Sequence, residues 1–165
     1  MSSNRYSFER ELVQPIVNLG IVVADFNSEI TGKMSEQALK RARELGACVT
    51  YVCSVPGSFD MPIIIQDLLE KEDVDAVATL GAIVKGETAH DEIIAAALCE
   101  QISALSVKFR KPVALGVSGP RESWAQAESR AEEYANRSVE AAITLVRVRS
   151  SLLKREDTGY PVLAE

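Results

Sequence analysis

Short apolar runs alternate with helical stripes along this chain. The longest apolar run, Ala76–Val84, carries no charge and is rich in small and β-branched side chains, which is typical of a strand buried on both faces. Shorter apolar runs predict three further strands, at Leu19–Ala24, Cys48–Cys53 and Val113–Val117. All four runs are too short to span a membrane as a helix.

Each predicted strand is followed by apolar residues at helical spacing, which predicts four helices. The stripes run from Ile30 to Leu45, from Ile64 to Leu69, from Ile94 to Leu105 and from Trp124 to Val146. Gly46 stands at the expected end of the first helix, and Pro62 lies in the first turn of the second. The last stripe is long for a globular helix, so we expect a kink or break near Ala135-Asn136.

Strands that alternate with helices imply a parallel sheet covered by helices on both faces. We therefore expect an α/β protein, a three-layer αβα sandwich whose four-stranded parallel sheet has the flavodoxin-like order 2-1-3-4. Residues 1–165 are expected to form one domain, with an N-terminal arm over 1–17 and a loosely ordered tail over 151–165. Pro15 restricts Phe8–Val17 to an edge strand or to a strand added to a neighbour's sheet.

The composition limits the classes of partner that this chain is expected to bind and the cellular compartment in which it is expected to occur. The net charge is −6 and no basic cluster stands out, which argues against nucleic acid as the main partner. The first residues contain no apolar signal core, so we expect a cytoplasmic protein. Cys48, Cys53 and Cys99 are expected to be buried, reduced thiols, and with one histidine in the chain they form no plausible zinc site.

The segment that follows the longest apolar run has the pattern of an anion site. Lys85-Gly86-Glu87-Thr88 forms a turn, Thr88 is the expected N-cap of a helix that begins near Ala89, and Asp91 is the expected partner in a capping box. A helix N-terminus at the end of a buried strand favours phosphate, and it favours the neutral, proton-accepting form of His90. The same residues also fit an ordinary cap, an ordinary turn and a surface histidine, so their spacing alone leaves both interpretations open.

Ligands of parallel α/β sheets bind at the carboxyl ends of the strands, and here those ends carry two phenylalanines, Phe26 and Phe59. Each phenylalanine alone is most simply explained by core packing, but two on one rim favour stacking on a flat ring. The chain has neither a dinucleotide nor a P-loop fingerprint, Ser58 lacks a nucleophile elbow, and only composition supports Asp60 with Glu87 as a glycosidase pair. The residues by themselves therefore predict an α/β protein that binds a phosphorylated compound and a flat ring.

Several motifs together resemble the lumazine synthase family, whose members act in riboflavin biosynthesis. The matching segments are Ala24–Asn27, VPGSFDMP at 55–62, GAIVKGETAH at 81–90, Gln126-Ala127 with Arg130, and Asn136-Arg137. The resemblance covers roughly residues 17–150 and is nearer to the archaeal branch than to the bacterial one. It implies a transferase that condenses 5-amino-6-(D-ribitylamino)uracil with 3,4-dihydroxy-2-butanone 4-phosphate. The product is 6,7-dimethyl-8-ribityllumazine, phosphate and water are released, and neither a metal nor an organic cofactor is needed.

The resemblance also implies a role for each matching residue. One residue, His90, would move protons. The ribitylaminouracil would be bound by Phe26, Asn27, Ser58, Phe59, Asp60, Ile83, Val84, Leu115 and Arg137. The phosphate would be bound by Gly86, Glu87, Thr88 and Arg130. Several positions depart from the family pattern: Glu87 puts a carboxylate into the phosphate turn, Asp60 is shorter than the usual glutamate, and Arg137 replaces a lysine. Leu115 stands where a phenylalanine is frequent, and Asp91-Glu92 replace a more aromatic helix start.

The family resemblance further implies a homopentamer in which Leu115 and Arg137 come from the neighbouring subunit, and twelve pentamers can close into an icosahedral shell. The short Glu132–Asn136 stretch, without an inserted loop, favours the shell. Without the resemblance, Arg130 is most simply explained as part of a solvated helix face. The alternative functions are an archaeal-type riboflavin synthase, a non-catalytic flavin or lumazine carrier, and a shell protein whose site has decayed.

Overall fold

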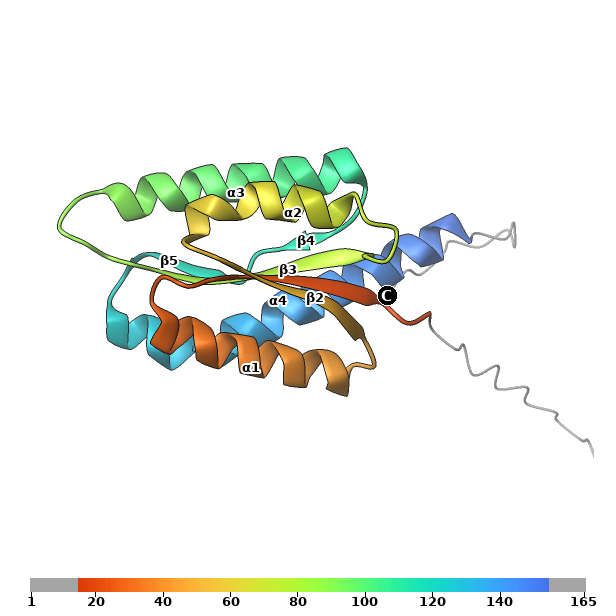
Figure 1. Cartoon of the computed structure of the whole chain (residues 1–165), viewed down its shortest axis with the longest axis horizontal. Coiled ribbons are helices and arrows are strands. Elements are labelled where there is room, and N and C mark those ends of the chain that lie inside the picture. The colour runs from red at the N-terminus through yellow and green to blue at the C-terminus, as the bar shows by residue number, and fades with distance from the viewer. Residues whose placement is uncertain (1–14, 155–165) are drawn as a thin grey trace, which may run out of the picture.

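A computed structural model describes residues 15–154 of the chain (Figure 1). The strands are β1 (Asn18–Ala24), β2 (Cys48–Val55), β3 (Ala76–Val84), β4 (Val113–Ala114) and β5 (Val117–Glu122). The helices are α1 (Ser28–Glu44), α2 (Met61–Leu69), α3 (His90–Phe109) and α4 (Trp124–Leu153), and a short 3₁₀ helix, η1, covers Ser58–Asp60. The predicted order of strands and helices is therefore confirmed, and the longest apolar run is strand β3 from end to end.

The strands form one parallel sheet in the order β2-β1-β3-β4, with β5 pairing β3 further along, as expected for a flavodoxin-like α/β fold. The single predicted fourth strand is divided into β4 and β5. Thr79 causes the division, because its hydroxyl donates to the carbonyl of Ala114 at 2.8 Å and accepts from the N–H of Gly116 at 3.2 Å. This buried side chain takes the place of a backbone partner between the two short strands.

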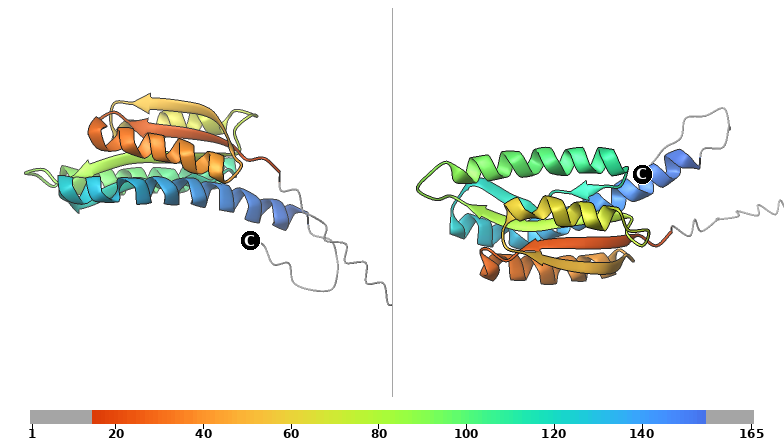
Figure 2. Two further views of the ribbon diagram at one scale, coloured as in Figure 1. Left: turned by 90° about the horizontal axis from the view of Figure 1, so that it is seen from below. Right: turned by 45° about the horizontal axis from the view of Figure 1, so that its top comes forward.

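Two helices cover each face of the sheet, α1 and α4 on one side and α2 and α3 on the other (Figures 1 and 2). Two separate apolar clusters fill the layers, one between the sheet and α1 with α4, and the other between the sheet and α2 with α3. Strand β3 contributes to both clusters, and eight of its nine residues are buried. Its burial on both faces, predicted from the uncharged run, is confirmed.

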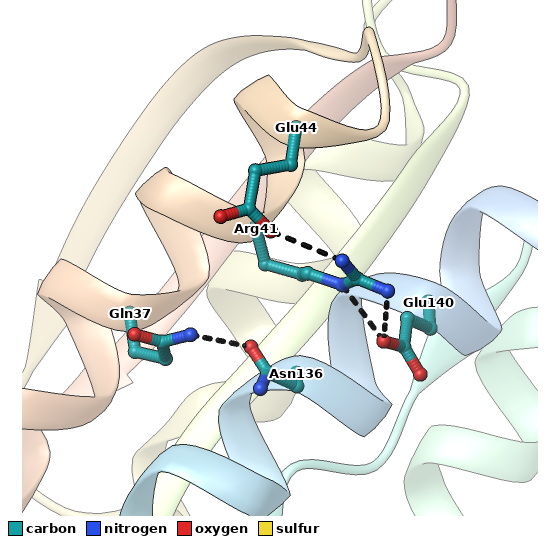
Figure 3. Close-up of polar contacts among 5 residues, drawn as sticks. All are labelled: Gln37, Arg41, Glu44, Asn136 and Glu140. Atoms are coloured by element: carbon teal, nitrogen blue, oxygen red, sulfur yellow. Dashed lines mark hydrogen bonds and ion pairs between the residues drawn. The ribbon is translucent and has the colours of Figure 1, made fainter.

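Helix α4 runs without a break from Trp124 to Leu153, so the kink expected near Ala135-Asn136 is absent. Alanines at helical spacing let α4 pack closely against α1 and the sheet through this region. Polar contacts hold the two helices together there: Gln37 donates to Asn136 at 2.8 Å, and Arg41 contacts Glu140 at 2.7 Å (Figure 3). The predicted Glu132–Asn136 connection is therefore part of a continuous helix.

The two ends of the chain differ in part from the expectations. Val17, assigned to the arm, is buried in the core, and its carbonyl accepts from the N–H of Cys48 at 2.9 Å. Most of the expected Phe8–Val17 strand lies outside the described residues, as does the tail from residue 155 onward, whereas 151–153 belong to α4.

The cysteines are less buried than expected, because they lie on an edge strand and on a surface helix, where only Cys53 packs against an apolar cluster. Cys48 and Cys99 are exposed and Cys53 is half-buried, and all three are free thiols. Within residues 15–154, no helix is long and apolar enough to cross a membrane.

Two glycines predict opposite responses to the same substitution. A Cβ on Gly116 would lie 2.2 Å from the Thr79 carbonyl oxygen, whereas a Cβ on Gly32, inside α1, would meet nothing within 4 Å. Gly116→Ala should lower the free energy of unfolding by about 2 kcal/mol or more because the core cannot accept the methyl group. Gly32→Ala should raise it by ~0.5–1 kcal/mol through reduced chain entropy. Urea denaturation of both variants tests the pair, and equal effects would show that the close packing at Gly116 is not rigid.

Candidate active site

A hollow of about 490 Å³ opens at the carboxyl edge of the sheet, where β1, β2 and β3 end. We call it the main hollow. Its lining includes Phe26, Asn27, Gly57, Ser58, Phe59, Asp60, Ala82, Ile83, Val84, Gly86, Thr88, His90, Asp91 and Ile94. Most of the site residues predicted from the sequence therefore lie around one cavity, and those that do not are Glu87, Leu115, Arg130 and Arg137. Its size suits a small organic molecule.

The loop after β1 is fastened to both neighbouring strands. The N–H groups of Asp25 and Phe26 donate to the carbonyls of Val55 and Pro56, at 2.7 Å and 3.0 Å. Asn27 has a left-handed backbone (φ 64°), and its side-chain amide donates to the carbonyl of Ala82 at 2.8 Å. Asn27 therefore connects the end of β1 to the end of β3 and fixes where Phe26 stands.

The segment after β2 adds a hydroxyl, an aromatic ring and a carboxylate to the lining of the main hollow. Ser58 is buried, and its hydroxyl oxygen would lie only 2.7 Å from a Cβ at position 81, so glycine there leaves room for it. The Asp60 carboxylate accepts from the N–H of Gly57 at 2.9 Å and closes the η1 turn. This hydrogen bond occupies one of the two Asp60 carboxylate oxygens and leaves the other for a ligand.

The two phenylalanines do not pack in the core. Phe26 is 72% exposed and Phe59 is 63% exposed, and both line the main hollow. The core-packing explanation therefore fails for each of them. Exposed apolar rings that line one cavity are suited to a flat ligand, because stacking removes a ring face from water.

The turn between β3 and α3 differs in detail from the expected capping box. Helix α3 begins at His90 with Ala89 as its N-cap, and no side chain makes a capping hydrogen bond there. The buried Asp91 instead accepts from the N–H of Arg121 at 2.9 Å, which ties the start of α3 to the end of β5. The Thr88 hydroxyl is thus not committed to capping, and His90 lies exposed in the first turn beside the main hollow.

A second, smaller hollow of about 340 Å³ lies on the other side of this turn. We call it the side hollow, and it is lined by Lys85, Gly86, Glu87, Thr88, Ala89, Asp91, Glu92 and Arg121. The two hollows share Gly86, Thr88 and Asp91. Glu87 lines only the side hollow, so the carboxylate that departs from the family pattern does not line the cavity of the aromatic rings.

Three predicted residues lie away from the main hollow within one chain. Leu115 is 45% exposed and lines a groove with α3, and Arg137 pairs with Glu133 on α4 at 3.5 Å. Arg130 is exposed on α4, yet it lies close enough to Glu122 for its charge to lower the pKa of that carboxyl. Arg130 therefore lies near Glu122 at the end of β5, as well as being exposed to solvent.

Glu122 is a buried carboxyl beside the turn that sequence reasoning missed. It is 6% exposed, it accepts a hydrogen bond from the Ser118 hydroxyl, and its backbone carbonyl accepts from the N–H of Lys85 at 2.8 Å. Burial raises its pKa above the ordinary value, and the Ser118 hydrogen bond and the charge of Arg130 offset only part of this effect. Only the pairing of β5 with β3 brings this residue to the turn, and no local sequence pattern indicates it.

Among residues 15–154, no group of three or more histidine, cysteine or acidic side chains is placed to hold a metal ion. The site instead combines exposed aromatic rings, a glycine turn at a helix N-terminus and one imidazole. The fold and the main hollow thus define an α/β protein with a ligand-sized cavity at the carboxyl edge of its parallel sheet. A family model described as 6,7-dimethyl-8-ribityllumazine synthase matches residues 17–151, so the chain belongs to the 6,7-dimethyl-8-ribityllumazine synthase family.

Curated relatives with this name support the assignment along most of the chain. The chain is 54% identical to one from Saccharolobus islandicus over 131 residues, which cover 79% of this chain and 85% of the relative. It is 49% identical to one from Saccharolobus solfataricus over 149 residues, 90% of this chain and 97% of the relative. A relative from Pyrobaculum arsenaticum is 44% identical over 150 residues, 91% of this chain and all of the relative.

The raised pKa of Glu122 predicts that ionisation of this carboxyl destabilises the folded protein, so that stability depends on pH. The folded protein holds the Glu122 proton more tightly than the unfolded chain, so stability from this group declines as the pH rises above the ordinary value of 4.5 and through its folded pKa. Glu122→Gln cannot ionise, and its melting temperature should therefore gain on that of the wild type as the pH rises from 4.5 through the folded pKa of Glu122. Thermal melts across this range test the prediction, with exposed Glu100→Gln as the control. Parallel curves for Glu122→Gln and the wild type would contradict it.

Proposed function

We propose that this chain is a transferase that condenses 5-amino-6-(D-ribitylamino)uracil with 3,4-dihydroxy-2-butanone 4-phosphate to give 6,7-dimethyl-8-ribityllumazine. Membership of the family supports this reaction. The single observation that carries it is that two exposed phenylalanines, a glycine turn and His90 line one hollow. That arrangement offers one place for a flat ring and one for a phosphate group, which are the distinctive parts of the two substrates.

In this proposal the pyrimidine ring lies against Phe26, beside Asn27. Ser58, Phe59 and Asp60, with the backbone of Ile83 and Val84, hold the uracil and the ribityl chain. The buried Ser58 hydroxyl and the exposed Asp60 carboxylate support these roles, because they supply hydrogen-bonding groups to the hollow that Phe26 lines.

The phosphate group of the second substrate is assigned to the turn that contains Gly86, Glu87 and Thr88. The first N–H groups of α3, which have no acceptor within the helix, and the uncommitted Thr88 hydroxyl support this assignment, because both are good donors to an anion. Arg130 supplies a positive charge, and its proximity to Glu122, next to the turn, supports this role. The space around Gly86 is open, since an added Cβ would meet nothing within 4 Å.

The proposed reaction has three chemical stages. The 5-amino nitrogen attacks the ketone carbon, and water leaves as the imine forms. Loss of the proton from C3 then expels phosphate by breaking the C4–O bond, and the resulting enol becomes a ketone. The ribityl-bearing nitrogen attacks that ketone, water leaves, and the second ring closes.

The chain's main contribution is to hold the two substrates together, an effect worth up to roughly 7–11 kcal/mol of the barrier. His90 accepts and returns protons in these steps, and its exposed position at the rim, on the first residue of α3, supports this role. General acid–base catalysis of this kind contributes about 10²–10⁴-fold.

The proposed site is completed by a neighbouring subunit of a homopentamer. Leu115 and Arg137 lie away from their own main hollow and on exposed surfaces, so they are available to a neighbour's site. Closure of twelve pentamers into an icosahedral shell is a further part of the proposal, and light scattering near the mass of a single pentamer would refute it. The three free thiols support a reducing compartment, the cytoplasm.

The direct test is to mix both substrates with the purified protein and follow the fluorescence of the lumazine product. Rapid formation of fluorescent product, with release of one phosphate for each lumazine, is the expected result. A carrier would bind the product without making it, and a riboflavin synthase would consume it. Either outcome, with both substrates present, would overturn the proposed condensation.

His90→Ala should lower kcat by about 10²–10⁴-fold while leaving activity above the uncatalysed rate, because substrate positioning remains. Steady-state kinetics with both substrates measures the change. His90→Gln is the matched variant, since it keeps a polar side chain but cannot carry the proton. Undiminished kcat in both variants would show that another group moves the protons.

A further inference from the structure

Arg121 stands across the side hollow from the phosphate turn. It is the last residue but one of β5, and its side chain lines that cavity with Lys85, Gly86 and Thr88. Two contacts hold it: its backbone N–H donates to Asp91 at 2.9 Å, and its Nε contacts Glu92 at 2.6 Å. The second contact is an ion pair between β5 and the first turn of α3.

The charges around the turn make this arginine useful to an anion. Three carboxylates, Glu87, Asp91 and Glu92, line the side hollow and would repel a phosphate dianion. Lys85 and Arg121 are the basic residues that line it. The backbone N–H of Arg121 binds Asp91, and its guanidinium binds Glu92. Arg121 therefore lies where its charge reduces the repulsion between these carboxylates and a phosphate.

Most N–H donors of the Arg121 guanidinium have no hydrogen-bond partner in the described part of the chain. An arginine carries five N–H donors, and in the described part of the chain only the Nε donor of Arg121 has a hydrogen-bond partner. Its side chain is 75% exposed, so turning the other donors toward a phosphate requires little desolvation. The ion pair with Glu92 is compatible with such a contact, because the fork of a guanidinium can serve two acceptors.

We propose that Arg121 is a second phosphate-binding residue, which acts beside Arg130 to hold the phosphorylated substrate against the Gly86–Thr88 turn. This inference rests on the proposed function and adds to it a residue whose charge offsets the carboxylates of Asp91 and Glu92 beside the turn. Arg121 binds the leaving phosphate through the side-hollow face of the turn, while the main hollow holds the ring of the other substrate. The phosphate thereby meets donors on both sides of the turn.

The chain supplies a closely matched control for this arginine. Arg121 has a left-handed backbone with φ 62°, and Arg110, at the opposite edge of the sheet, also has a left-handed backbone with φ 55°. Asparagine tolerates this conformation and carries no charge. Arg121→Asn and Arg110→Asn therefore make the same chemical change on the same backbone conformation at different places.

The test is steady-state kinetics of the assembled enzyme at saturating aminouracil. Arg121→Asn should raise KM for the phosphorylated substrate by about three- to tenfold, with kcat and the KM for the aminouracil unchanged. The inhibition constant of inorganic phosphate should rise by the same factor, and both effects should shrink at high ionic strength. Arg121→Lys should fall between the wild type and Arg121→Asn, and Arg110→Asn should match the wild type.

An unchanged KM and an unchanged phosphate inhibition constant in Arg121→Asn would overturn the inference and leave Arg121 as a partner of Glu92 only. A fall in kcat alone would overturn it as well. If Arg121→Asn fails to assemble, as seen by size-exclusion chromatography, Arg121→Lys decides the question on the same two constants. Failure of the proposed function can be told apart from failure of this inference, because the wild type would then make no lumazine. In that case calorimetric titration with inorganic phosphate would still compare the phosphate affinity of Arg121→Asn with that of Arg110→Asn.

Discussion

The site depends on strand β3 being held immobile between two helix layers. Its buried residues contact both apolar clusters, so the strand cannot shift without disturbing packing on both faces. Its carboxyl end then serves as the anchor for the surrounding loops. Asn27 bonds the Ala82 carbonyl, Gly81 makes room for Ser58, and Lys85 bonds the carbonyl of Glu122. Loops from three parts of the chain thus take fixed positions around one cavity.

Two kinds of surface meet at this edge and suit two kinds of ligand. On one side of the β3–α3 turn, exposed phenylalanine rings offer apolar faces, and on the other side charged groups gather around a helix N-terminus. Separation of the two keeps the carboxylate of Glu87 away from the aromatic cavity. Because the two hollows are separate, residues of β5 and α4 can change the electrostatic potential at the turn without changing the contacts that hold a flat ring.

Most of the predicted site residues lie around one cavity of one chain, and the proposed homopentamer assigns Leu115 and Arg137 to a neighbour's site. The aromatic rings, the turn and His90 come together without help, because consecutive parallel strands end at one edge. Leu115 and Arg137 lie elsewhere on the surface of the same chain. In the proposed homopentamer, ligand binding is coupled to subunit association, since contacts with the ligand are complete only between subunits.

The sequence by itself determined the order of strands and helices, the buried central strand and the loops that line the main hollow. These features follow from local periodicity and from the rule that parallel strands present their carboxyl ends together. Only the tertiary structure decided that Thr79 divides the fourth strand and that α4 is unbroken at Asn136. It also decided that Ala89, not Thr88, occupies the N-cap position of α3. Likewise, only the pairing of β5 with β3 brings Arg121 and Glu122 to the turn, some 30 residues from Asp91 in sequence. Such contacts depend on the register between distant segments, and no local pattern in the chain encodes that register.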